Sequence, residues 1–287
     1  MADRPRFGPA GVPPTFHMLK ARLEDVPKLL RNEGLDAFEY QAVRWGAKPQ
    51  MKRGEAEKLG LKAAENDVWL SLHGSYFINF CGGKEVIEAS KQRLIACATA
   101  AEWMKAHTVV FHPGFYGKTP RTEVFKNCLE ALKEVAESLK ALGIRNVKIG
   151  PETMGKSSQF GSLEEILSLC EEVEHTQPVI DWAHLHAREN GCLKTVDDFR
   201  KIVGIIENRL GTEAVKNMHC HFTKVEFTEK GEKCHHVLEE AAYGPDFSML
   251  AKVIVEFDLK PVIISESPML DLDAIKMRDM LKKQLKS

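Results

Sequence analysis

The sequence lacks several features that would place it in other classes of protein. Its 287 residues include seven cysteines, an odd number, and no two of them form a CxxC pair. This fits a reducing compartment better than a disulfide framework or a zinc finger. No apolar run approaches the length that crosses a membrane, and the first residues lack the apolar stretch of a signal peptide. These absences predict a cytoplasmic protein with no membrane partner.

The sequence also lacks an excess of charge of either sign. It has 40 Lys and Arg against 41 Asp and Glu, which gives a formal net charge of -1 at pH 7. Such a chain has no global attraction to nucleic acid, so any contact with DNA would depend on a local basic patch. Gly82-Gly83-Lys84 lacks the full phosphate-loop pattern, and no nucleotide cofactor is expected.

What the sequence does contain is a regular alternation of strand and helix patterns. Eight short runs rich in β-branched or aromatic residues alternate with segments of helical periodicity, and no flexible linker divides them. One of the helices is expected to begin after Ser162, which forms a capping-box pattern with Glu165. Because an α/β barrel uses about 250 residues as one domain, we predict a TIM (β/α)8 barrel forming a single domain over residues 1–287. The expected strands are 6–8, 37–43, 68–77, 108–112, 146–152, 178–181, 217–225 and 261–266.

In six of these segments a short apolar run leads into a side chain that can bind a metal ion. In a barrel the carboxyl ends of the strands converge on one mouth, so these side chains should form one site. They are more numerous than the ligands of a single tetrahedral ion, which predicts a site for several metals. The residues are His73, His112, Glu152, Asp181, His221 and Glu266.

Spacing refines this set at two strands. If the chain turns into a helix after Asp181, an i,i+3 spacing brings His184 to the mouth beside it. His219 and His221 share one face of their strand, and His221 lies nearer the carboxyl end. His221 is therefore the expected ligand and His219 lies one layer deeper. Glu152, on a central strand, is expected to bridge two metals.

A site of this kind suits phosphodiester cleavage. Several divalent ions can polarise a phosphate, activate a bound water near neutral pH and neutralise charge on the leaving oxygen. We assign Glu152 and Glu266 catalytic roles, because they would hold the metals and orient the water. Zn²⁺ fits these ligands, with Mn²⁺ or Fe²⁺ as alternatives.

Loops expected at the same mouth supply candidate substrate contacts. The loops 114–121 and 154–161 mix aromatic and cationic residues. Aromatic rings can stack on bases and cations can contact phosphates. The candidate stacking residues are Tyr76, Phe115 and Tyr116, and the candidate phosphate contacts are Arg44, Lys118, Arg121 and Lys156.

The ordered motifs at these positions resemble those of the endonuclease IV family of apurinic/apyrimidinic endonucleases. The motifs are His73-Gly-Ser-Tyr76, His112-Pro-Gly, Glu152-Thr-Met, Asp181-Trp-Ala-His184, His221-Phe, Cys234-His235-His236 and Glu266-Ser-Pro. The resemblance implies a barrel with three zinc ions that acts as a hydrolase in base excision repair and cleaves DNA on the 5′ side of abasic sites. It carries over eight metal ligands, namely His73, His112, Glu152, Asp181, His184, His221, His235 and Glu266.

One position departs from the family pattern. The family has Asp-Arg-His where this chain has Lys233-Cys234-His235, so lysine replaces the aspartate of the third metal site. Glu232 or Cys234 could replace that carboxylate, Lys233 could itself occupy the charge site, or the chain could hold two metals. The sequence leaves these alternatives open.

Two other functions are also left open. The wider superfamily contains sugar isomerases and epimerases that resemble xylose isomerase and are built on the same barrel, and fold alone does not separate them. The third alternative is a metal-loaded barrel that binds nucleic acid without cleaving it. A monomer is expected in each case.

Overall fold

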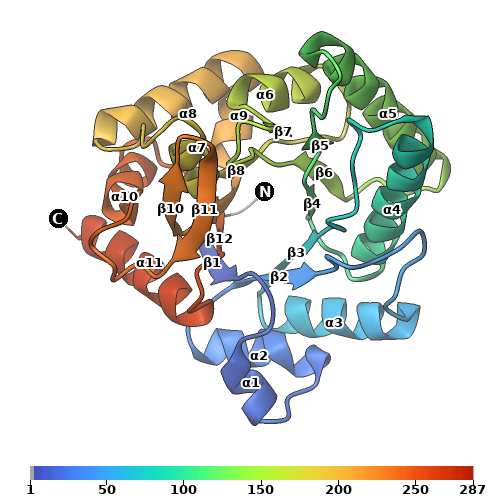
Figure 1. Ribbon diagram of the computed structural model, residues 1–287. Coiled ribbons are helices and arrows are strands. Elements are labelled where there is room, and N and C mark those ends of the chain that lie inside the picture. Colours follow the sequence, from blue (N-terminus) through green and yellow to red (C-terminus); the bar gives the residue numbers. More distant parts are fainter. Residues whose placement is uncertain (1–2, 287) are drawn as a thin grey trace.

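Parallel strands alternate with helices along the chain, which the computed structural model describes from residue 3 to residue 286. The strands form an inner barrel and the helices surround it as a ring (Figure 1). The barrel strands are β1 (Arg6–Pro9), β2 (Ala37–Gln41), β3 (Trp69–His73), β4 (Thr108–Phe111), β6 (Lys148–Pro151), β8 (Val179–Asp181), β9 (His219–Phe222) and β12 (Val262–Ser265).

Two four-stranded parallel sheets close into the barrel. Their strand orders are β1-β12-β9-β8 and β2-β3-β4-β6. Parallel bridges between Ala10 and Glu39 and between Glu152 and Val179 join the two sheets at both seams. The carboxyl ends of the eight strands therefore open at one mouth. The predicted TIM barrel is confirmed.

Strand alternation sorts the side chains between two environments. On β3, Leu70 and Leu72 point outward into the main core between strands and helices, while Ser71 and His73 point into the barrel. On β12, Ile263 joins the outer core, whereas Val262 and Ile264 pack with Ala37 in a small inner cluster. Polar side chains such as Ser71 and His73 therefore fill the barrel interior toward the carboxyl ends of the strands.

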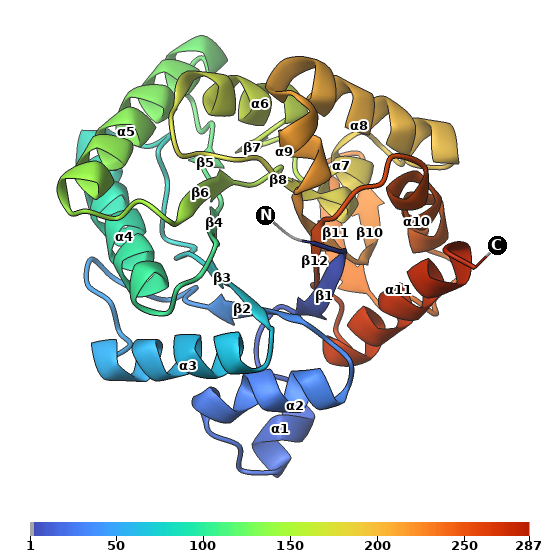
Figure 2. The ribbon, with the colours of Figure 1, turned by 180° about the vertical axis from the view of Figure 1, so that it is seen from behind.

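The long helices each bury an apolar face in the core around the strands. Ser162 accepts a hydrogen bond from the Glu165 backbone N–H at the start of α6, as the capping-box pattern predicts. Figure 2 shows the same ring of helices from behind. The helices are α1 (Pro14–Met18), η1 (Leu23–Asp25), α2 (Val26–Asn32), α3 (Arg53–Glu65), α4 (Lys84–Trp103), α5 (Arg121–Ala141), α6 (Leu163–Glu172), α7 (Trp182–Arg188), α8 (Val196–Leu210), α9 (Thr212–Lys216), α10 (Phe247–Glu256) and α11 (Asp271–Gln284).

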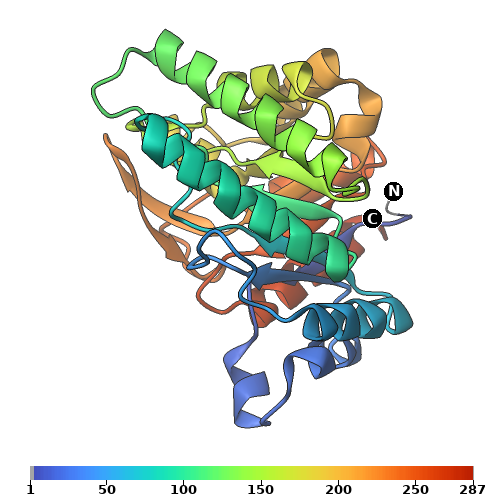
Figure 3. The same cartoon turned by 90° about the vertical axis from the view of Figure 1, so that its right-hand side faces the viewer.

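Most predicted strands were longer than the observed ones, and two were too long by five residues, because the chain leaves the barrel earlier than its apolar pattern suggests. The run 68–77 leaves the barrel after His73. The run 217–225 breaks after Phe222, and β10 (Lys224–Thr228) then pairs with β11 (Gly231–His236) in an antiparallel hairpin. This hairpin projects from the mouth, at the end of the barrel opposite the start of β1 (Figure 3).

The two loops expected at the mouth contact each other. β5 (Gly114–Phe115) and β7 (Gln159–Phe160) form a short antiparallel pair, so the segments 114–121 and 154–161 are joined. Among residues 3–286, no helix is long and apolar enough to cross a membrane.

Candidate metal centre

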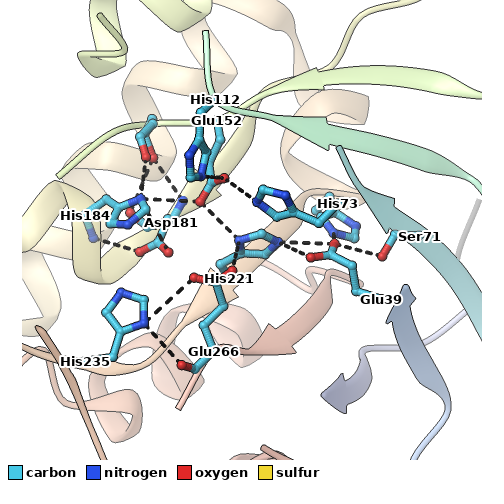
Figure 4. A network of polar contacts seen from close by, with 12 residues as sticks. Glu39, Ser71, His73, His112, Glu152, Asp181, His184, His221, His235 and Glu266 are labelled. Atoms are coloured by element: carbon cyan, nitrogen blue, oxygen red, sulfur yellow. Dashed lines mark hydrogen bonds and ion pairs between the residues drawn. The ribbon is translucent and has the colours of Figure 1, made fainter. Parts of the chain in front are cut away.

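Glu152, the first residue after β6, lies at the middle of a network of imidazoles at the mouth (Figure 4). Its Oε2 is 3.0 Å from His112 Nε2 and 3.4 Å from His73 Nε2. Its Oε1 is 3.1 Å from His221 Nδ1 and 3.3 Å from His184 Nδ1. The carboxylate is fully buried and faces two groups of ligands with its two oxygens. This is the geometry that a bridging carboxylate needs.

Backbone carbonyls orient three of the imidazoles. The Nδ1–H groups of His73, His184 and His235 donate to the carbonyl oxygens of Gly74, Thr153 and Glu266 at 3.0, 2.8 and 3.1 Å. A carbonyl oxygen can only accept, so in the neutral ring the other nitrogen, Nε2, carries a lone pair. The Nε2 atoms of these three residues face a carboxylate of the mouth. Such orientation of ligands by their outer partners is typical of metal sites.

Several buried polar atoms of the mouth make no hydrogen bond within residues 3–286. They include Nε2 of His73 and His235, Oε2 of Glu152 and Oδ2 of Asp181. A buried polar atom without a partner costs about 1–3 kcal/mol, so such atoms need an explanation. All four belong to residues that the resemblance assigns as ligands. The residues present therefore fit a bound cation.

The seventh strand places His221, and not His219, at the centre. His221 Nδ1 lies 3.2 Å from Glu266 Oε1 as well as close to Glu152. Its Nε2 is 3.2 Å from Glu39 Oε1, on β2, and His219 Nε2 is 3.1 Å from Glu39 Oε2. His219 thus lies one layer deeper, as the strand period indicates, and Glu39 is the outer partner of both rings.

Asp181 and His184 come together because a helix begins between them. Asp181 ends β8 and caps α7, and its Oδ1 accepts a hydrogen bond from the His184 backbone N–H at 2.7 Å. The capping contact turns the chain so that the imidazole of His184 returns to the mouth, 3.6 Å from Asp181 Oδ2. The turn predicted after Asp181 is confirmed.

A β-bulge supplies the carboxylate that the sequence lacked at Lys233. On β10, Glu226 pairs with Cys234 but the next residue, Phe227, pairs with Glu232, so Lys233 is the extra residue. The bulge changes the alternation and aims Glu232 inward, with Oε2 3.4 Å from His184 Nε2 and Oε1 3.3 Å from His235 Nε2. Lys233 points outward to Glu226, so the alternative in which Lys233 fills the charge site is wrong.

Two glycines let this hairpin approach the loop after β6. A Cβ on Gly155 would lie 2.8 Å from Glu232 Cβ, and a Cβ on Gly231 would lie 2.2 Å from the Gly155 carbonyl oxygen. Gly231 also has a φ of +96°. The Glu232 backbone N–H donates to Gly155 O at 3.0 Å. His235 is thus presented by β11 of the hairpin, while His184 comes from α7.

The pKa values reflect how closely these charges are packed. Burial alone would raise the pKa of Glu152, but the nearby His221 and His112 hold it well below its ordinary value. Burial, with Glu266 and Glu152 nearby, raises the pKa of Asp181 to about 6 despite the opposing effect of His184. Burial would also raise the pKa of Glu232, yet His235 and His184 lower it to about 2. Carboxylates crowded in this way favour a bound cation.

The ligand atoms fall into three groups around Glu152. Within each group the ligand atoms lie within 4.8 Å of one another, as the ligands of one ion do. The groups around Glu152 are His73, His112 and Glu152; Glu152, Asp181, His221 and Glu266; and His184, Glu232 and His235. A further group, formed by Glu39, His219 and His221, lies one layer deeper and shares His221 with the second.

The candidate substrate contacts divide into exposed and packed side chains. Tyr76 is 53% exposed and its ring stacks on that of His112, with centroids 5.2 Å apart. The neighbouring Phe77 is 59% exposed, and Phe115 is also exposed. Arg44, Lys118 and Lys156 are exposed as well. These side chains are free to meet a substrate.

Tyr116, a weaker stacking candidate from the sequence, is not such a residue. Its side chain is buried, and its hydroxyl donates to Glu165 at 2.7 Å. The guanidinium of Arg121, at the first residue of α5, lies 4.5 Å from the centroid of the Tyr116 ring. Tyr116 therefore has a packing role. The sequence of the loop alone does not show which of its aromatic rings is buried.

Sequence reasoning missed Glu39. Ser71 Oγ donates to Glu39 Oε2 at 2.9 Å, and both histidines of β9 contact the same fully buried carboxylate. Glu39 lies within its strand and not at the end, so a search for ligands at strand ends passes over it. A charged residue between Phe38 and Tyr40 was the available signal.

The fold and the site together define the class of protein: a TIM barrel with a histidine and carboxylate centre at the carboxyl ends of its strands. The chain belongs to the xylose isomerase-like TIM barrel family, whose model matches residues 27–284.

Relatives of known sequence agree with this placement. An uncharacterized protein of Methanocaldococcus jannaschii is 34% identical over 273 residues, which cover 94% of each chain. A probable endonuclease 4 of Staphylococcus carnosus is 28% identical over 194 residues, 63% of each chain. The second relative supports the resemblance to the endonuclease IV family.

This chain shares its fold with solved structures of two kinds of protein. Endonuclease IV from Thermus thermophilus superposes with a TM-score of 0.68 at 19% identity, covering 91% of this chain and 94% of that one. A D-tagatose 3-epimerase-like protein superposes with a TM-score of 0.64 at 18% identity, covering 92% and 95%. At these identities the likeness concerns the fold alone.

Proposed function

We propose that this protein is a metal-dependent phosphodiesterase that cleaves DNA on the 5′ side of abasic sites. The observation that carries the proposal is the set of three ligand groups arranged around Glu152, with Glu232 completing the third. The similarity to a probable endonuclease 4 supports the same reaction. The ligand set is the eight residues named from the sequence, with Glu232 added.

The residues of the mouth have distinct tasks in this proposal. Glu152 and Glu266 hold cations and orient the attacking water, and Glu39 fixes the ring of His221 through its Nε2. Divalent ions held here, zinc or alternatively Mn²⁺ or Fe²⁺, supply charge stabilisation at the phosphate and a lower pKa for a bound water. The nitrogen and oxygen ligands suit all three ions.

The exposed side chains around the mouth are assigned to DNA. Tyr76 lies over His112 and presents an open ring face on which a base can stack. Arg44 and Lys118, with Lys156, would contact backbone phosphates, while Arg121 acts less directly because it lies over Tyr116. Monomeric state and cytoplasmic location stay predictions from the sequence.

A sugar isomerase or epimerase is the second candidate, because a sugar epimerase-like protein shares the fold. Such an enzyme with one ion needs only the group formed by Glu152, Asp181, His221 and Glu266. It would give no role to the Nε2 atoms of His73 and His235, which make no hydrogen bond within the described residues. The number of ligand groups therefore favours the phosphodiesterase.

The test is a nicking assay on a duplex that contains one abasic site. We expect cleavage 5′ to the site by purified protein, loss of cleavage after chelation and recovery on adding Zn²⁺. The matched undamaged duplex should remain intact. Epimerisation of a ketohexose without nicking would overturn the proposal in favour of the second candidate, and salt-sensitive DNA binding without any product would favour a binding protein.

A further inference from the structure

The outer face of the β10–β11 hairpin carries a second cluster of metal-type side chains. Glu226 and Cys234 lie directly opposite each other in the antiparallel register, and His236 follows two residues later on the same face. The inner face of the hairpin carries Val225 and His235 instead. The cluster of Glu226, Cys234 and His236 thus lies on the far side of the hairpin from the metal centre of the mouth.

The three ligand atoms have the spacing of a tetrahedral coordination face. Cys234 Sγ is 3.2 Å from His236 Nε2 and 3.4 Å from Glu226 Oε2. His236 Nε2 is 3.6 Å from Glu226 Oε2. Zinc bonds of about 2.3 Å to sulfur and about 2.0 Å to nitrogen or oxygen at tetrahedral angles separate neighbouring ligand atoms by about 3.3–3.5 Å. The cluster matches these separations with little rearrangement.

Outer partners already orient two of the three ligands. His236 Nδ1 lies 2.8 Å from Glu240 Oε2, so the ring donates its Nδ1–H to that carboxylate and directs the Nε2 lone pair toward Cys234. Its ring also stacks on Tyr243, with centroids 3.7 Å apart. Lys233 Nζ donates to Glu226 Oε1 at 2.7 Å, which leaves Oε2 for the cluster. A carboxylate that holds the imidazole in this way is characteristic of zinc-binding histidines.

We propose that Cys234 Sγ, His236 Nε2 and Glu226 Oε2 bind one divalent transition-metal ion of the zinc type. The thiol now donates its hydrogen to Glu226, and binding would release that proton to solvent. Cys234 is exposed, so water can take the fourth position. A thiolate ligand selects softer ions than the sulfur-free mouth does.

The site would also fix the register of the hairpin. It ties Glu226 on β10 to two residues of β11 that follow the bulge at Lys233. That bulge aims Glu232 into the mouth, so an ion on the outer face would hold the inner face in its binding geometry. The inference itself does not depend on the proposed function, because it concerns residues outside the mouth.

Cobalt(II) provides a test that reports on this site alone. We expect Co²⁺ titrated into the chelator-treated full-length protein to give a near-ultraviolet thiolate-to-cobalt charge-transfer band, since the mouth ligands contain no sulfur. The band should disappear in Cys234→Ser and persist in Cys192→Ser, a control at a partly buried cysteine. It should also persist in Glu152→Ala, which separates this site from the mouth. A missing band in the parent protein, or a band that survives Cys234→Ser, would overturn the proposal.

Thiol reactivity gives an independent measurement. All seven cysteines lie within the described residues, and among them only Cys234 is exposed. Cys234 should therefore react first with iodoacetamide. Zn²⁺ should slow its alkylation by about tenfold or more, because the bound sulfur is no longer a free nucleophile. His236→Ala should remove this protection while leaving the thiol reactive. Equal alkylation with and without Zn²⁺ would contradict the site.

Discussion

The two ends of the barrel balance their clustered charges in different ways. At the end where the strands begin, Arg4 lies 3.1 Å from Asp36 and 2.5 Å from Asp67, and Arg6 lies 2.9 Å from Asp67. At the mouth, carboxylates face imidazoles whose other ring nitrogen is hydrogen-bonded to a backbone carbonyl. Several ligand atoms there make no hydrogen bond within the described residues. The first end offsets its charges internally, whereas the second is arranged for a cation from outside. Substitutions at the mouth should therefore alter function, and substitutions at the other end should alter stability.

Replacing Glu152 should have the largest effect. Glu152→Ala removes the carboxylate shared by two ligand groups, and loss of several kcal/mol of charge stabilisation corresponds to a nicking rate lower by about 10³-fold or more. Metal content per chain should fall in the same variant, as measured by elemental analysis. If Glu152→Ala nicked abasic DNA at the parent rate, the bridging role would be wrong.

Glu232 and Lys233 form a matched pair that tests the bulge. Glu232→Gln should weaken the least tightly held metal by about 100-fold, because it removes the carboxylate between His184 and His235. Lys233→Gln should leave the affinity unchanged, since this lysine contacts Glu226 on the outer face. The measurement is a metal titration against a competing chelator. The opposite order of effects would mean that the bulge is misplaced.

Glu39 should have a smaller effect because it acts through other residues. Glu39→Gln weakens the orientation of His221, and loss of such an outer partner costs about tenfold or more in metal affinity. Ser71→Ala removes one hydrogen bond from an uncharged hydroxyl to the same carboxylate and should cost less. A metal titration measures the affinity of both variants. An unchanged metal affinity in Glu39→Gln would show that Glu39 does not support the metal centre.

Replacing Asp67, at the other end of the barrel, should have the smallest effect. It should change stability and not activity. Desolvation opposes ionisation of Asp67, but Arg4 and Arg6 together lower its pKa below the ordinary value of 3.8. Because its folded pKa is the lower one, the stabilisation exists above pH 3.8 and disappears as the pH falls through the folded pKa. The side chain is 47% exposed, so solvent screening limits the loss in Asp67→Asn to about 1 kcal/mol or less.

Thermal unfolding of Asp67→Asn at neutral and acidic pH measures this difference. The gap between the two proteins should close at acidic pH, while nicking at neutral pH stays at the parent level. Asn also suits the φ of +52° at this position, so backbone strain does not confound the comparison. A fall in nicking with no change in unfolding would erase the contrast between the two ends.

The sequence predicted much of the mouth because the carboxyl ends of all strands of a barrel lie at the same face. His73, Asp181 and Glu266 could be placed at one opening from their position after apolar runs alone. Glu39 could not, since its role depends on which residue of a neighbouring strand lies beside it. The burial of Tyr116 could not be read from its loop for the same reason, because its partner Glu165 belongs to a segment far away in the chain.

The third ligand group shows most clearly where sequence reasoning stops. The family pattern put the expected carboxylate at Lys233, two residues before His235, and residues two apart share one face of a strand. One extra residue in the hairpin reversed that count and brought Glu232 inward. A bulge arises from the pairing of β10 with β11 and from the docking of Gly231 on Gly155, which no local pattern encodes.

By itself the sequence determined the barrel, the end at which the site lies and most of the side chains there. These follow from hydrophobic periodicity and strand direction, which are local properties of the chain. The tertiary structure alone decided which carboxylate completes the third group, which ring nitrogen faces the centre and that Glu39 supports His221. Those outcomes depend on contacts between segments distant in sequence, and such contacts exist only once the barrel has closed.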